Sequence, residues 1–492
     1  MTETAKKKRG MPSSFTILLA LLAIVAVITV IVSGTSGGAV TAARLSDFCT
    51  APIKGFADAL PVCLFVMILG GFLGMMTETG ALDNGIAVLV QKLKGNEIML
   101  IPVLMLIFSL GGTTYGMCEE TVPFYALLAA TMMAAGFDPM VGAATALLGA
   151  GCGCLGSTVN PFAVGAAVDA LTGVDIAVNQ SIIIGLGAVL WLVTTVMSIV
   201  FVMNYAKKVK ADKGSTILSM QELKDAEEAH GKAASEVHKE VKLTGRQKGV
   251  LIAFAFTFVV MIVGFIPLAD LNEGVANFFD AGAVYDADGN AVVQGWSALI
   301  TGLPIGQWYF DEASTWFFLM AILIGIIGGL SEKQIVNTFI TGAADMMSVV
   351  LVIALARGIS VLMASTGLDV FVLDAAANAL AGLSGVIFAP MSFLVYFGLS
   401  FLIPSTSGMA TVSMPIMGPL AVKLGFSPEV MVMIFSAAIG VVNLFTPTSG
   451  AIMGGLALAK IEWTTWLKFA LKLIVALSVV CAVILTVACV LL

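Results

Sequence analysis

The sequence predicts an all-α, polytopic membrane protein made of two inverted repeats, each with one re-entrant hairpin and one discontinuous helix. Three observations lead to this fold class. Of the 492 residues, 59% are hydrophobic and only 11% are charged, whereas a soluble domain carries about 25% charged residues. Apolar runs of about 20 residues, enough to cross a bilayer, recur along the chain. The two halves of the chain also share a pattern of residues.

The N-terminal segment 1–13 contains a basic run, KKKR at 6–9, ahead of the first apolar run. No small-residue cleavage site follows it, so the segment is interpreted as a cytoplasmic N-terminus and not as a removed signal peptide. Two apolar regions, 98–171 and 385–460, are interrupted by Gly, Pro, Ser and Thr. The uninterrupted apolar runs lie at about 14–32, 60–79, 180–205, 247–268, 313–330, 346–365 and 469–491.

An internal repeat relates the two halves. Segment 55–80 aligns with 342–367 at a constant offset of 287 residues, and TYGMCEETVP at 114–123 aligns with TSGMATVSMP at 406–415 at an offset of 292. Further blocks match in the same order, GFDP with GFSP among them. Ordered blocks with nearly constant offsets argue against chance, and internal repetition of this kind is typical of secondary transporters.

The distribution of lysine and arginine indicates that the repeats are inverted. Segment 206–248 carries ten of the 24 Lys and Arg residues, whereas segment 269–312 has seven acids and no base. One unrepeated span joins these two segments, so the second repeat begins on the opposite face of the membrane, in agreement with the positive-inside rule. The predicted parts are a cytoplasmic N-terminus (1–13), a first repeat (14–205), a cytoplasmic linker (206–246), a connecting span with an outer loop (247–312) and a second repeat (313–492). The linker is expected to form a short solvated helix.

Each repeat contains two interrupted segments. A polar tip separates two apolar arms at about 98–135 and again at about 388–424, and the arms are too short to cross comfortably, which favours re-entrant hairpins. Gly and Pro then break a span at about 139–171 and at about 428–460. Lipid cannot satisfy the unpaired backbone groups of such breaks, so they occur only around a cavity or inside protein. The four interruptions are therefore expected to converge near the midplane, where half-helix N-termini attract anions and unwound carbonyls attract cations.

The candidate substrate-binding residues are the polar side chains at these interruptions. They are Thr113, Thr114, Glu119 and Glu120 at the first tip, Ser157, Thr158 and Asn160 at the first break, Ser405, Thr406 and Ser407 at the second tip, and Asn443, Thr446, Thr448 and Ser449 at the second break. The alternative is that the breaks are packing kinks, because glycine is common in membrane helices. Their matched positions, rich in Ser, Thr and Asn, favour binding.

Glu119 and Glu120 place two adjacent carboxylates in an apolar region. A carboxylate within the membrane costs about 2.5–3.5 kcal/mol, so each needs compensation. The second repeat has Thr411 and Val412 at the matching positions, so the acidity is not part of the shared scaffold. We hypothesise that Glu119, assisted by Glu120, binds the cationic group of a substrate whose carboxylate is held by the Ser/Thr-rich segments of the second repeat. Two alternatives stay open: the pair caps the second hairpin arm, or it binds a coupling proton or sodium ion.

Arg357 is the other isolated charge in an apolar run. It is a candidate for binding a substrate carboxylate, or for a structural ion pair with an acid such as Asp374 or Glu78. Asp58 and Asp345 precede matched spans and are interpreted as helix-start or interfacial residues outside the site.

Other function classes are disfavoured by what the chain lacks. Its two histidines, His230 and His238, lie in the polar linker, and its seven cysteines show no metal-ligand spacing, so no metal site or cofactor is expected. No GxxxxGK[ST] loop for ATP and no HExxH motif is present. The chain is therefore not predicted to be an enzyme or to bind nucleic acid, and a channel and an intramembrane hydrolase are weaker alternatives to a carrier.

Four motifs resemble those of the YfcC-type family in the DcuC/ArcD group of the ion transporter superfamily: GMCEETVPFYALL, GSTVNPFAVGAA, PSTSGMATVSMPIMGPLA and NLFTPTSGAIMGGLA. The resemblance covers essentially the whole chain, and the Glu-Glu tip is its most specific motif. It implies an elevator-type carrier, with a dimerising scaffold and a transport domain that holds both hairpins and both broken helices. Members of the family include basic amino-acid (arginine/ornithine) antiporters and C4-dicarboxylate carriers.

Together these features predict a secondary active transporter of a small amino acid, best a basic amino acid exchanged for a related one by alternating access. The expected setting is the bacterial cytoplasmic (inner) membrane, with the chain as a homodimer in the lipid bilayer. The alternative is an ion-coupled C4-dicarboxylate carrier. In that case Arg357 and the half-helix N-termini bind the substrate, and the glutamates bind the coupling protons or sodium.

Overall fold

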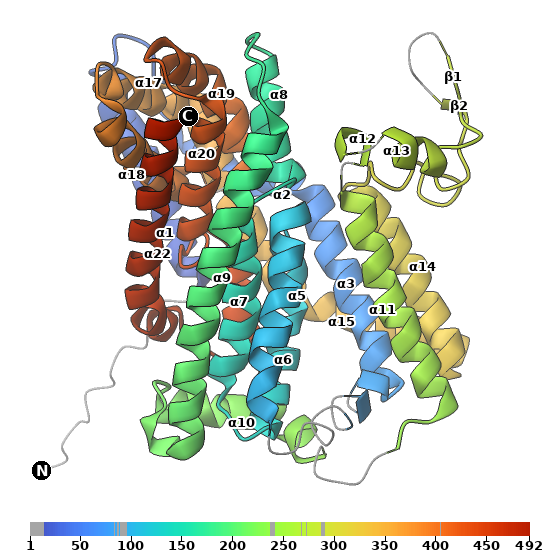
Figure 1. Ribbon diagram of the computed structural model, residues 1–492. Helices are drawn as coiled ribbons and strands as arrows, with labels where there is room; N and C mark the ends of the chain where they lie inside the picture. Colours follow the sequence, from blue (N-terminus) through green and yellow to red (C-terminus); the bar gives the residue numbers. More distant parts are fainter. Residues whose placement is uncertain are drawn as a thin grey trace, which may run out of the picture.

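The computed structural model describes residues 14–82, 84–85, 88, 96–236, 242–266, 268–271, 273–286, 291–403 and 405–492. The described chain is almost entirely helical (Figure 1). By length and composition, eight of its helices can cross a membrane: Phe15–Ser33, Leu60–Glu78, Glu97–Tyr115, Gln180–Ala211, Gly245–Phe265, Phe310–Gly328, Met347–Thr366 and Trp463–Leu491. The predicted all-α, multi-pass membrane protein is thereby confirmed.

The elements before the linker begin and end at residues that suit helix termini. Asp138 and Asn179 each accept a hydrogen bond from a first-turn N–H group of the helix that follows, which is the usual role of an N-cap. In chain order these elements are α1 (Ser14–Ser33), α2 (Leu45–Asp58), α3 (Leu60–Glu78), the 3₁₀ turn η1 (Glu97–Met99), α5 (Leu100–Tyr115), the 3₁₀ turn η2 (Glu119–Thr121), α6 (Val122–Ala134), α7 (Pro139–Leu155), the π-helical turn η3 (Pro161–Gly165), α8 (Ala166–Thr172) and α9 (Gln180–Ala211).

The remaining elements show the same capping. Thr244 and Ser331 start their helices with capping boxes closed by Gln247 and Gln334. In chain order these elements are the 3₁₀ turn η4 (Lys213–Ser215), α10 (Met220–Glu236), α11 (Gly245–Phe265), α12 (Leu268–Leu271), α13 (Glu273–Phe279), β1 (Val284–Tyr285), β2 (Ala291–Val293), α14 (Phe310–Gly328), α15 (Glu332–Asp345), α16 (Met347–Thr366), α17 (Leu368–Leu380), α18 (Gly385–Leu402), α19 (Thr406–Lys423), α20 (Pro428–Val442), α21 (Gly450–Leu458) and α22 (Trp463–Leu491). The strands β1 and β2 pair antiparallel.

The helices pack in two groups. In the first group α3 contacts α14 and α15, α2 contacts α16, α1 contacts α16, and α11 contacts α14. In the second group α7 contacts α5, α6 and α9, while α20 contacts α18, α19 and α22. The helices α3, α11 and α14 lie together on the right of Figure 1, and α9, α20 and α22 lie on the left. The second group is centred on α7 and α20, which contact each other and are almost wholly buried.

Close glycine contacts hold the first group together. A Cβ atom on Gly55 would lie 2.3 Å from both the Ala354 carbonyl oxygen and the Gly358 nitrogen, so α2 and α16 cross with their backbones in contact. A Cβ atom on Gly342 of α15 would lie 2.4 Å from the Gly70 carbonyl oxygen of α3. Small residues allow such close approach of helices in a membrane. Larger side chains at these positions would force the helices apart.

The first hairpin arm differs from the prediction. The sequence predicts an arm too short to cross a membrane comfortably, whereas η1 and α5 together form a continuous apolar helix of 19 residues from Glu97 to Tyr115. The extra length comes from the tip, because the polar residues Thr113 and Thr114 remain helical. The hydroxyl of Thr114 donates to the Leu110 carbonyl oxygen one turn earlier, at 2.6 Å.

The linker helix α10 is also different from the prediction, because one of its faces is docked and not solvated. It packs against α6. Glu222 is buried and accepts hydrogen bonds from the backbone nitrogens of Ser219 at 2.7 Å and Glu462 at 2.9 Å. The ring Nε2 of His230 lies 3.1 Å from the Leu458 carbonyl oxygen, and burial lowers the pKa of this imidazole. The linker helix therefore contacts the C-terminal end of α21 and the N-terminal end of α22.

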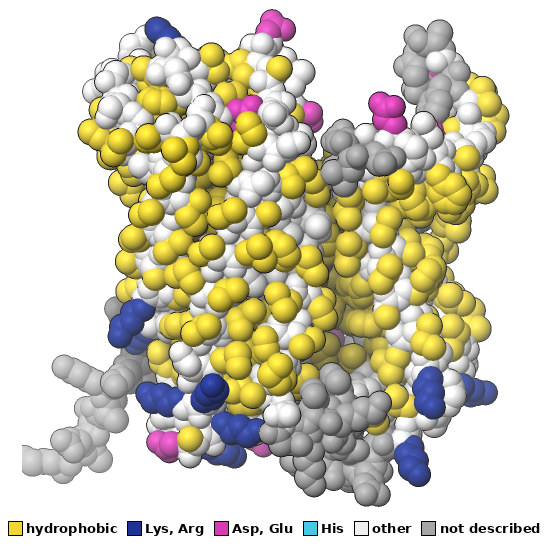
Figure 2. Space-filling model, viewed as in Figure 1, with side chains coloured by type: hydrophobic (Ala, Val, Ile, Leu, Met, Phe, Trp, Pro, Cys, Tyr) yellow, Lys and Arg dark blue, Asp and Glu magenta, His cyan; other side chains and the backbone are white. Residues whose placement is uncertain are grey.

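The surface separates by charge. Most of the lysine and arginine side chains visible in Figure 2 lie at one end of the molecule, a broad hydrophobic belt covers the middle, and most of the visible acidic side chains lie at the other end. This distribution is the one expected of a protein whose middle section is embedded in lipid.

Candidate functional site

The first hairpin tip is an unwound segment between α5 and α6. Helix α5 ends at Tyr115 and is followed by Gly116, which adopts a φ of +81° that favours glycine. Glu119 and Glu120 follow in the turn η2, and α6 begins at Val122. Glu120 is buried, and its Oε2 accepts a hydrogen bond from the Cys118 nitrogen at 2.9 Å. The two carboxylates therefore have different surroundings. Glu120 accepts a hydrogen bond from the backbone of the tip, and Glu119 does not share this contact.

The second hairpin tip begins a helix. Helix α19 starts at Thr406, and the Oγ of Ser405 caps it by accepting a hydrogen bond from the Gly408 nitrogen at 3.1 Å. The first turn of a helix has unpaired N–H groups and attracts negative charge. Ser405, Thr406 and Ser407 thus combine hydroxyl groups with a helix N-terminus.

The first helix break lies between α7 and η3. Thr113 of the first hairpin donates its hydroxyl to the Gly156 carbonyl oxygen at 2.6 Å, and its own carbonyl accepts the Thr158 nitrogen at 2.8 Å. Asn160 then caps the following turn by accepting hydrogen bonds from the backbone nitrogens of Phe162 at 2.9 Å and Ala163 at 3.3 Å. The hairpin and the broken helix consequently form one connected unit.

The second helix break lies between α20 and α21. Two tryptophans satisfy the carbonyl groups that the break exposes: Trp466 Nε1 donates to Leu444 at 2.9 Å and Trp463 Nε1 donates to Phe445 at 2.7 Å. Both tryptophans belong to α22, which thereby fixes the break in place. Such internal partners are needed because lipid offers none.

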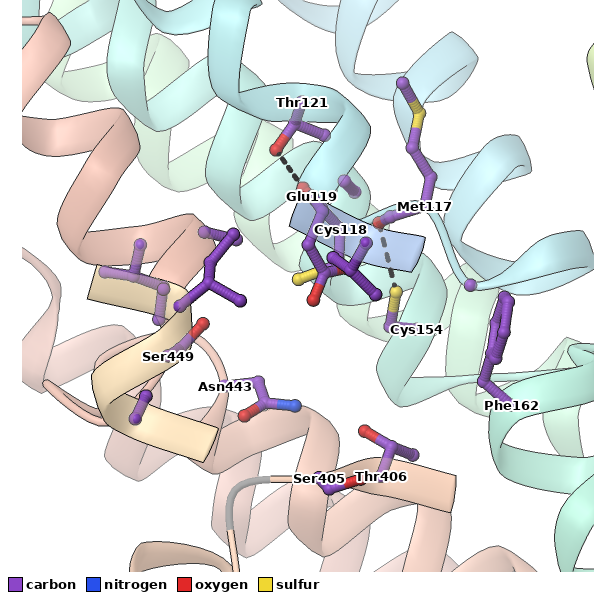
Figure 3. A pocket seen from close by; sticks show the side chains of 18 of the residues that line it. Met117, Cys118, Glu119, Thr121, Cys154, Phe162, Ser405, Thr406, Asn443 and Ser449 are labelled. Atoms are coloured by element: carbon purple, nitrogen blue, oxygen red, sulfur yellow. Dashed lines mark hydrogen bonds between the residues drawn. The ribbon is translucent and has the colours of Figure 1, made fainter. Parts of the chain in front are cut away.

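A cavity of about 310 Å³ lies where the two tips and the two breaks meet, at the small end of the range for small-molecule sites. In Figure 3 the Glu119 side chain points into the space framed by Asn443, Ser449, Ser405 and Thr406. Nine of the residues predicted from sequence line this cavity: Glu119, Asn160, Arg357, Ser405, Thr406, Ser407, Asn443, Thr448 and Ser449.

Six other predicted residues do not line the cavity: Thr113, Thr114, Glu120, Ser157, Thr158 and Thr446. Their side chains make internal hydrogen bonds instead. Ser157 donates to the Cys154 carbonyl oxygen at 2.6 Å, and Thr446 shares a hydrogen bond of 2.7 Å with Thr448. A break in a helix needs partners for its own backbone as well as groups for a ligand, and sequence alone does not divide the hydroxyls between these two tasks.

The first group of helices contributes a further wall of the cavity, with residues for which the sequence gives no site signal. Asp58 at the end of α2, Phe310 at the start of α14 and Ile353 of α16 line this wall. The thiols of Cys118 and Cys154 line the cavity beside Glu119. Apolar residues and cysteines in a membrane helix carry no sequence signal for a site, so only their three-dimensional positions identify them.

Arg357 has a partner that was not predicted. Its Nε lies 2.9 Å from Asp58 Oδ2, and both side chains line the cavity. The partners suggested by the sequence, Asp374 and Glu78, form no ion pair with Arg357 among the described residues. Asp58, which the sequence places outside the site, is the last residue of α2 and lines the cavity.

The acidic and basic side chains that line the cavity are the carboxylates of Glu119 and Asp58 and the guanidinium of Arg357. No ion pair among the described residues includes Glu119. No group of three or more His, Cys, Asp or Glu that could hold a metal occurs among the described residues. The geometry therefore offers a place for a ligand cation near Glu119 and donors for a ligand anion on the facing wall.

Membrane-crossing helices around a cavity lined by interrupted helices are typical of membrane transporters. A family model described as "DcuC: C4-dicarboxylate anaerobic carrier" matches residues 40–490, and the chain belongs to this DcuC family of carriers. The family resemblance predicted from the motifs is thereby confirmed.

Two relatives match most of the chain. A protein of Haemophilus influenzae, described as an "Uncharacterized protein", is 28% identical over 445 residues, which cover 90% of this chain and 78% of the relative. The "Putative basic amino acid antiporter YfcC" of Escherichia coli K12 is 27% identical over 440 residues, which cover 87% of this chain and 77% of the relative.

Two solved structures show a distant likeness. The Neisseria gonorrhoeae MtrF structure, reported for a class of antimetabolite efflux pumps, matches with 16% identity and a TM-score of 0.43 over 98% of this chain and 96% of its own. The YdaH transporter of Alcanivorax borkumensis matches with 15% identity and a TM-score of 0.46 over 97% of this chain and 98% of its own.

Proposed function

We propose that this chain is a secondary transporter of a basic amino acid, of the arginine/ornithine exchange type. The observation that carries the proposal is Glu119, whose carboxylate lines the cavity and forms no ion pair among the described residues. A membrane-embedded carboxylate is costly unless an opposite charge compensates it, and a ligand cation supplies that charge. Ser405 and the N-terminus of α19 offer donors for the ligand carboxylate. The name of the Escherichia coli relative agrees with this substrate class.

A C4-dicarboxylate carrier is the second candidate, favoured by the family description and by Arg357 in the cavity wall. The charges of the cavity argue against it. Arg357 is paired with Asp58, so with Glu119 ionised the three groups sum to one negative charge. A dianion would therefore meet net repulsion unless protons or sodium ions bound at the same time. A basic amino acid carries two positive groups and one negative group, which complements the cavity.

For the mechanism we infer inverted repeats and elevator-type alternating access. Reciprocal packing supports the repeats, because α2 contacts α16 as α3 contacts α15, and α5 contacts α7 as α18 contacts α20. The division of the cavity supports the elevator. Glu119 and Asn443 come from the group centred on α7 and α20, whereas Asp58 and Arg357 come from the group built on α3 and α16. Movement of the group centred on α7 and α20 past the group built on α3 and α16 carries Glu119, Asn443 and the bound ligand across the membrane, while Asp58 and Arg357 stay behind.

The same proposal places the chain in the bacterial cytoplasmic membrane with its N-terminus in the cytoplasm. The gathering of lysine and arginine at one end of the molecule supports that end as the cytoplasmic one (Figure 2). The group built on α3 and α16 is then the stationary scaffold, through which two copies of the chain form a homodimer.

The test is a ligand screen on the purified full-length protein, read as the shift of its thermal unfolding midpoint. Arginine and ornithine are expected to raise the midpoint in proportion to the logarithm of their concentration, because a ligand of the folded state stabilises it. Citrulline has nearly the same shape as arginine but no side-chain charge, and it is expected to give no shift at the same concentration.

The alternative has its own arm in the screen. Succinate and fumarate are expected to give no shift, with sodium or without it, in either mildly acidic or mildly basic buffer. A shift by succinate that depends on sodium or on low pH, together with none by arginine, would establish the dicarboxylate carrier instead. Counterflow of radiolabelled arginine in proteoliposomes, saturable in arginine, then distinguishes a carrier from a channel.

A further inference from the structure

The ion pair between Arg357 and Asp58 has the position of a ligand-binding group. Arg357 lies in α16, and Asp58 is the last residue of α2. The Nε and Oδ2 atoms are 2.9 Å apart, and the two side chains are 25% and 52% exposed. Both line the cavity that contains Glu119. A pair serving only to join two helices would be expected between them, out of reach of a ligand.

The backbone fixes the position of this pair. Helices α2 and α16 cross at Gly55 and Gly358, where the two backbones are in direct contact. Arg357 is one residue from that crossing and Asp58 is three residues from it. The helices are therefore already held together by the glycine contact, and the ion pair is not needed to define their distance.

The pair retains binding capacity after forming its own contact. The ion pair joins the Nε of Arg357 to one carboxylate oxygen of Asp58, and no other ion pair among the described residues includes Arg357. A guanidinium presents five donors in a planar fork, and a carboxylate accepts through two oxygens. Donors of Arg357 and an acceptor of Asp58 thus remain for a ligand in the cavity.

We propose that the Asp58–Arg357 pair recognises the zwitterionic head group of the transported amino acid. The guanidinium binds the α-carboxylate, together with the hydroxyls of the second tip, and Asp58 binds the α-ammonium group. The inference rests on the proposed function, in which Glu119 binds the side-chain cation. Placing two opposite charges beside the two opposite charges of the head group satisfies all four without separating the protein pair.

In this assignment, different residues of the protein recognise the two halves of the ligand. Glu119 distinguishes a charged side chain from a neutral one, and the ion pair distinguishes an amino acid from an amine. The two preferences are therefore separable by mutation. Arginine and agmatine are the probes, because agmatine has the same guanidinium group and chain but no carboxylate.

The experiment measures the affinity of arginine and agmatine for the full-length protein in lipid nanodiscs. The wild type is expected to prefer arginine. In the double variant Asp58→Asn/Arg357→Gln, arginine binding weakens about ten- to a hundredfold, the range expected for lost hydrogen bonds to charged groups. Agmatine binding weakens less, because agmatine has no carboxylate and loses only the contact of its ammonium group with Asp58. Arg357→Lys keeps the charge but loses the planar fork, and it is expected to give a smaller loss of the same preference.

Asp345→Asn is the matched control. Asp345 aligns with Asp58 in the internal repeat, is exposed, and does not line the cavity, so its substitution is expected to leave both affinities unchanged. Glu119→Gln is the second reference, because it should weaken arginine and agmatine together.

The outcomes separate this inference from the proposed function. Wild-type protein that binds agmatine as tightly as arginine, or a folded double variant that keeps the wild-type ratio, overturns the head-group assignment while the role of Glu119 stands. If the double variant does not fold, Arg357→Lys decides: an unchanged ratio overturns the assignment. Wild-type protein that binds neither compound overturns the proposed function itself.

Discussion

The two hairpin tips have matching positions in the chain but different backbones. At the first tip α5 continues through Thr114 to Tyr115, and Glu119 follows in a 3₁₀ turn before α6 begins. At the second tip α18 stops at Leu402, and α19 already begins at Thr406, the residue that aligns with Thr114. The first tip therefore presents a loop with carboxylates, and the second presents the N-terminus of a helix with hydroxyls.

The two tips differ most at a pair of glycines that the sequence aligns. Gly116 ends a helix with a φ of +81°, whereas Gly408, its aligned partner, lies inside the first turn of α19. The same residue type thus falls after a helix in one half and within a helix in the other. The change places acceptors on one side of the cavity and N–H donors on the other, and under the proposed function these two sides bind the cation and the anion of the ligand.

The largest effect on ligand affinity is expected from a substitution in the first tip, which carries the two glutamates. Glu119→Gln removes the one carboxylate of this tip that lines the cavity, and we expect the affinity for arginine to fall about a hundredfold or more, since loss of one partner of a buried charge pair costs about 2–5 kcal/mol. Isothermal titration calorimetry on the purified variant measures the change. Unaltered arginine affinity would show that Glu119 does not bind the ligand.

A glycine comparison tests the backbone difference between the tips. Gly116→Ala forces a side chain into a left-handed conformation, with its Cβ only 2.6 Å from Asn160 Oδ1, and we expect it to destabilise the protein by about 1–3 kcal/mol. Gly408→Ala keeps a helical residue, with its Cβ 3.0 Å from the Ser405 Oγ, and is expected to cost less than about 1 kcal/mol. Thermal unfolding in one detergent compares the two variants, and equal shifts would contradict the assigned backbones.

The hydroxyl tip is expected to contribute less than the acidic one. The double variant Thr406→Val/Ser407→Ala removes two cavity-lining hydroxyls but keeps the N-terminus of α19 and its Ser405 cap. We expect arginine affinity to fall about three- to tenfold, the value of roughly one neutral hydrogen bond, with agmatine affinity unchanged. An equal loss for both compounds would show that these hydroxyls do not contact the ligand carboxylate.

The smallest effect is expected at the second glutamate. Glu120→Gln keeps an acceptor for the Cys118 nitrogen, the contact that the carboxylate makes in the folded chain. We expect arginine affinity within about twofold of wild type and a loss of stability below about 1.5 kcal/mol, the size of a typical hydrogen bond. A loss of affinity as large as that of Glu119→Gln would mean that the two carboxylates act as one group.

Sequence reasoning identified the main residues of the cavity because charge and helix-breaking residues are rare within membrane spans. Glu119 and Arg357 each interrupt an apolar run, and Asn160, Ser405 and Asn443 each accompany a Gly or Pro break. All five line the cavity. Burying a charge or breaking a helix in lipid is costly, so such residues are informative even in an isolated amino-acid sequence.

The remaining assignments depended on contacts between segments that are distant in sequence. Asp58 belongs to the cavity only because the Gly55–Gly358 crossing brings the end of α2 beside Arg357. The division of labour between Glu119 and Glu120 depends on a single backbone hydrogen bond at the first tip.

The sequence by itself determined that the chain is a helical membrane protein with repeated interruptions, since hydropathy and helix breaking act over a few neighbouring residues. Only the tertiary structure decided which polar groups satisfy the broken backbone and which remain for a ligand. That choice depends on the distances between α2, α7, α16, α19 and α20, and packing among distant segments fixes those distances.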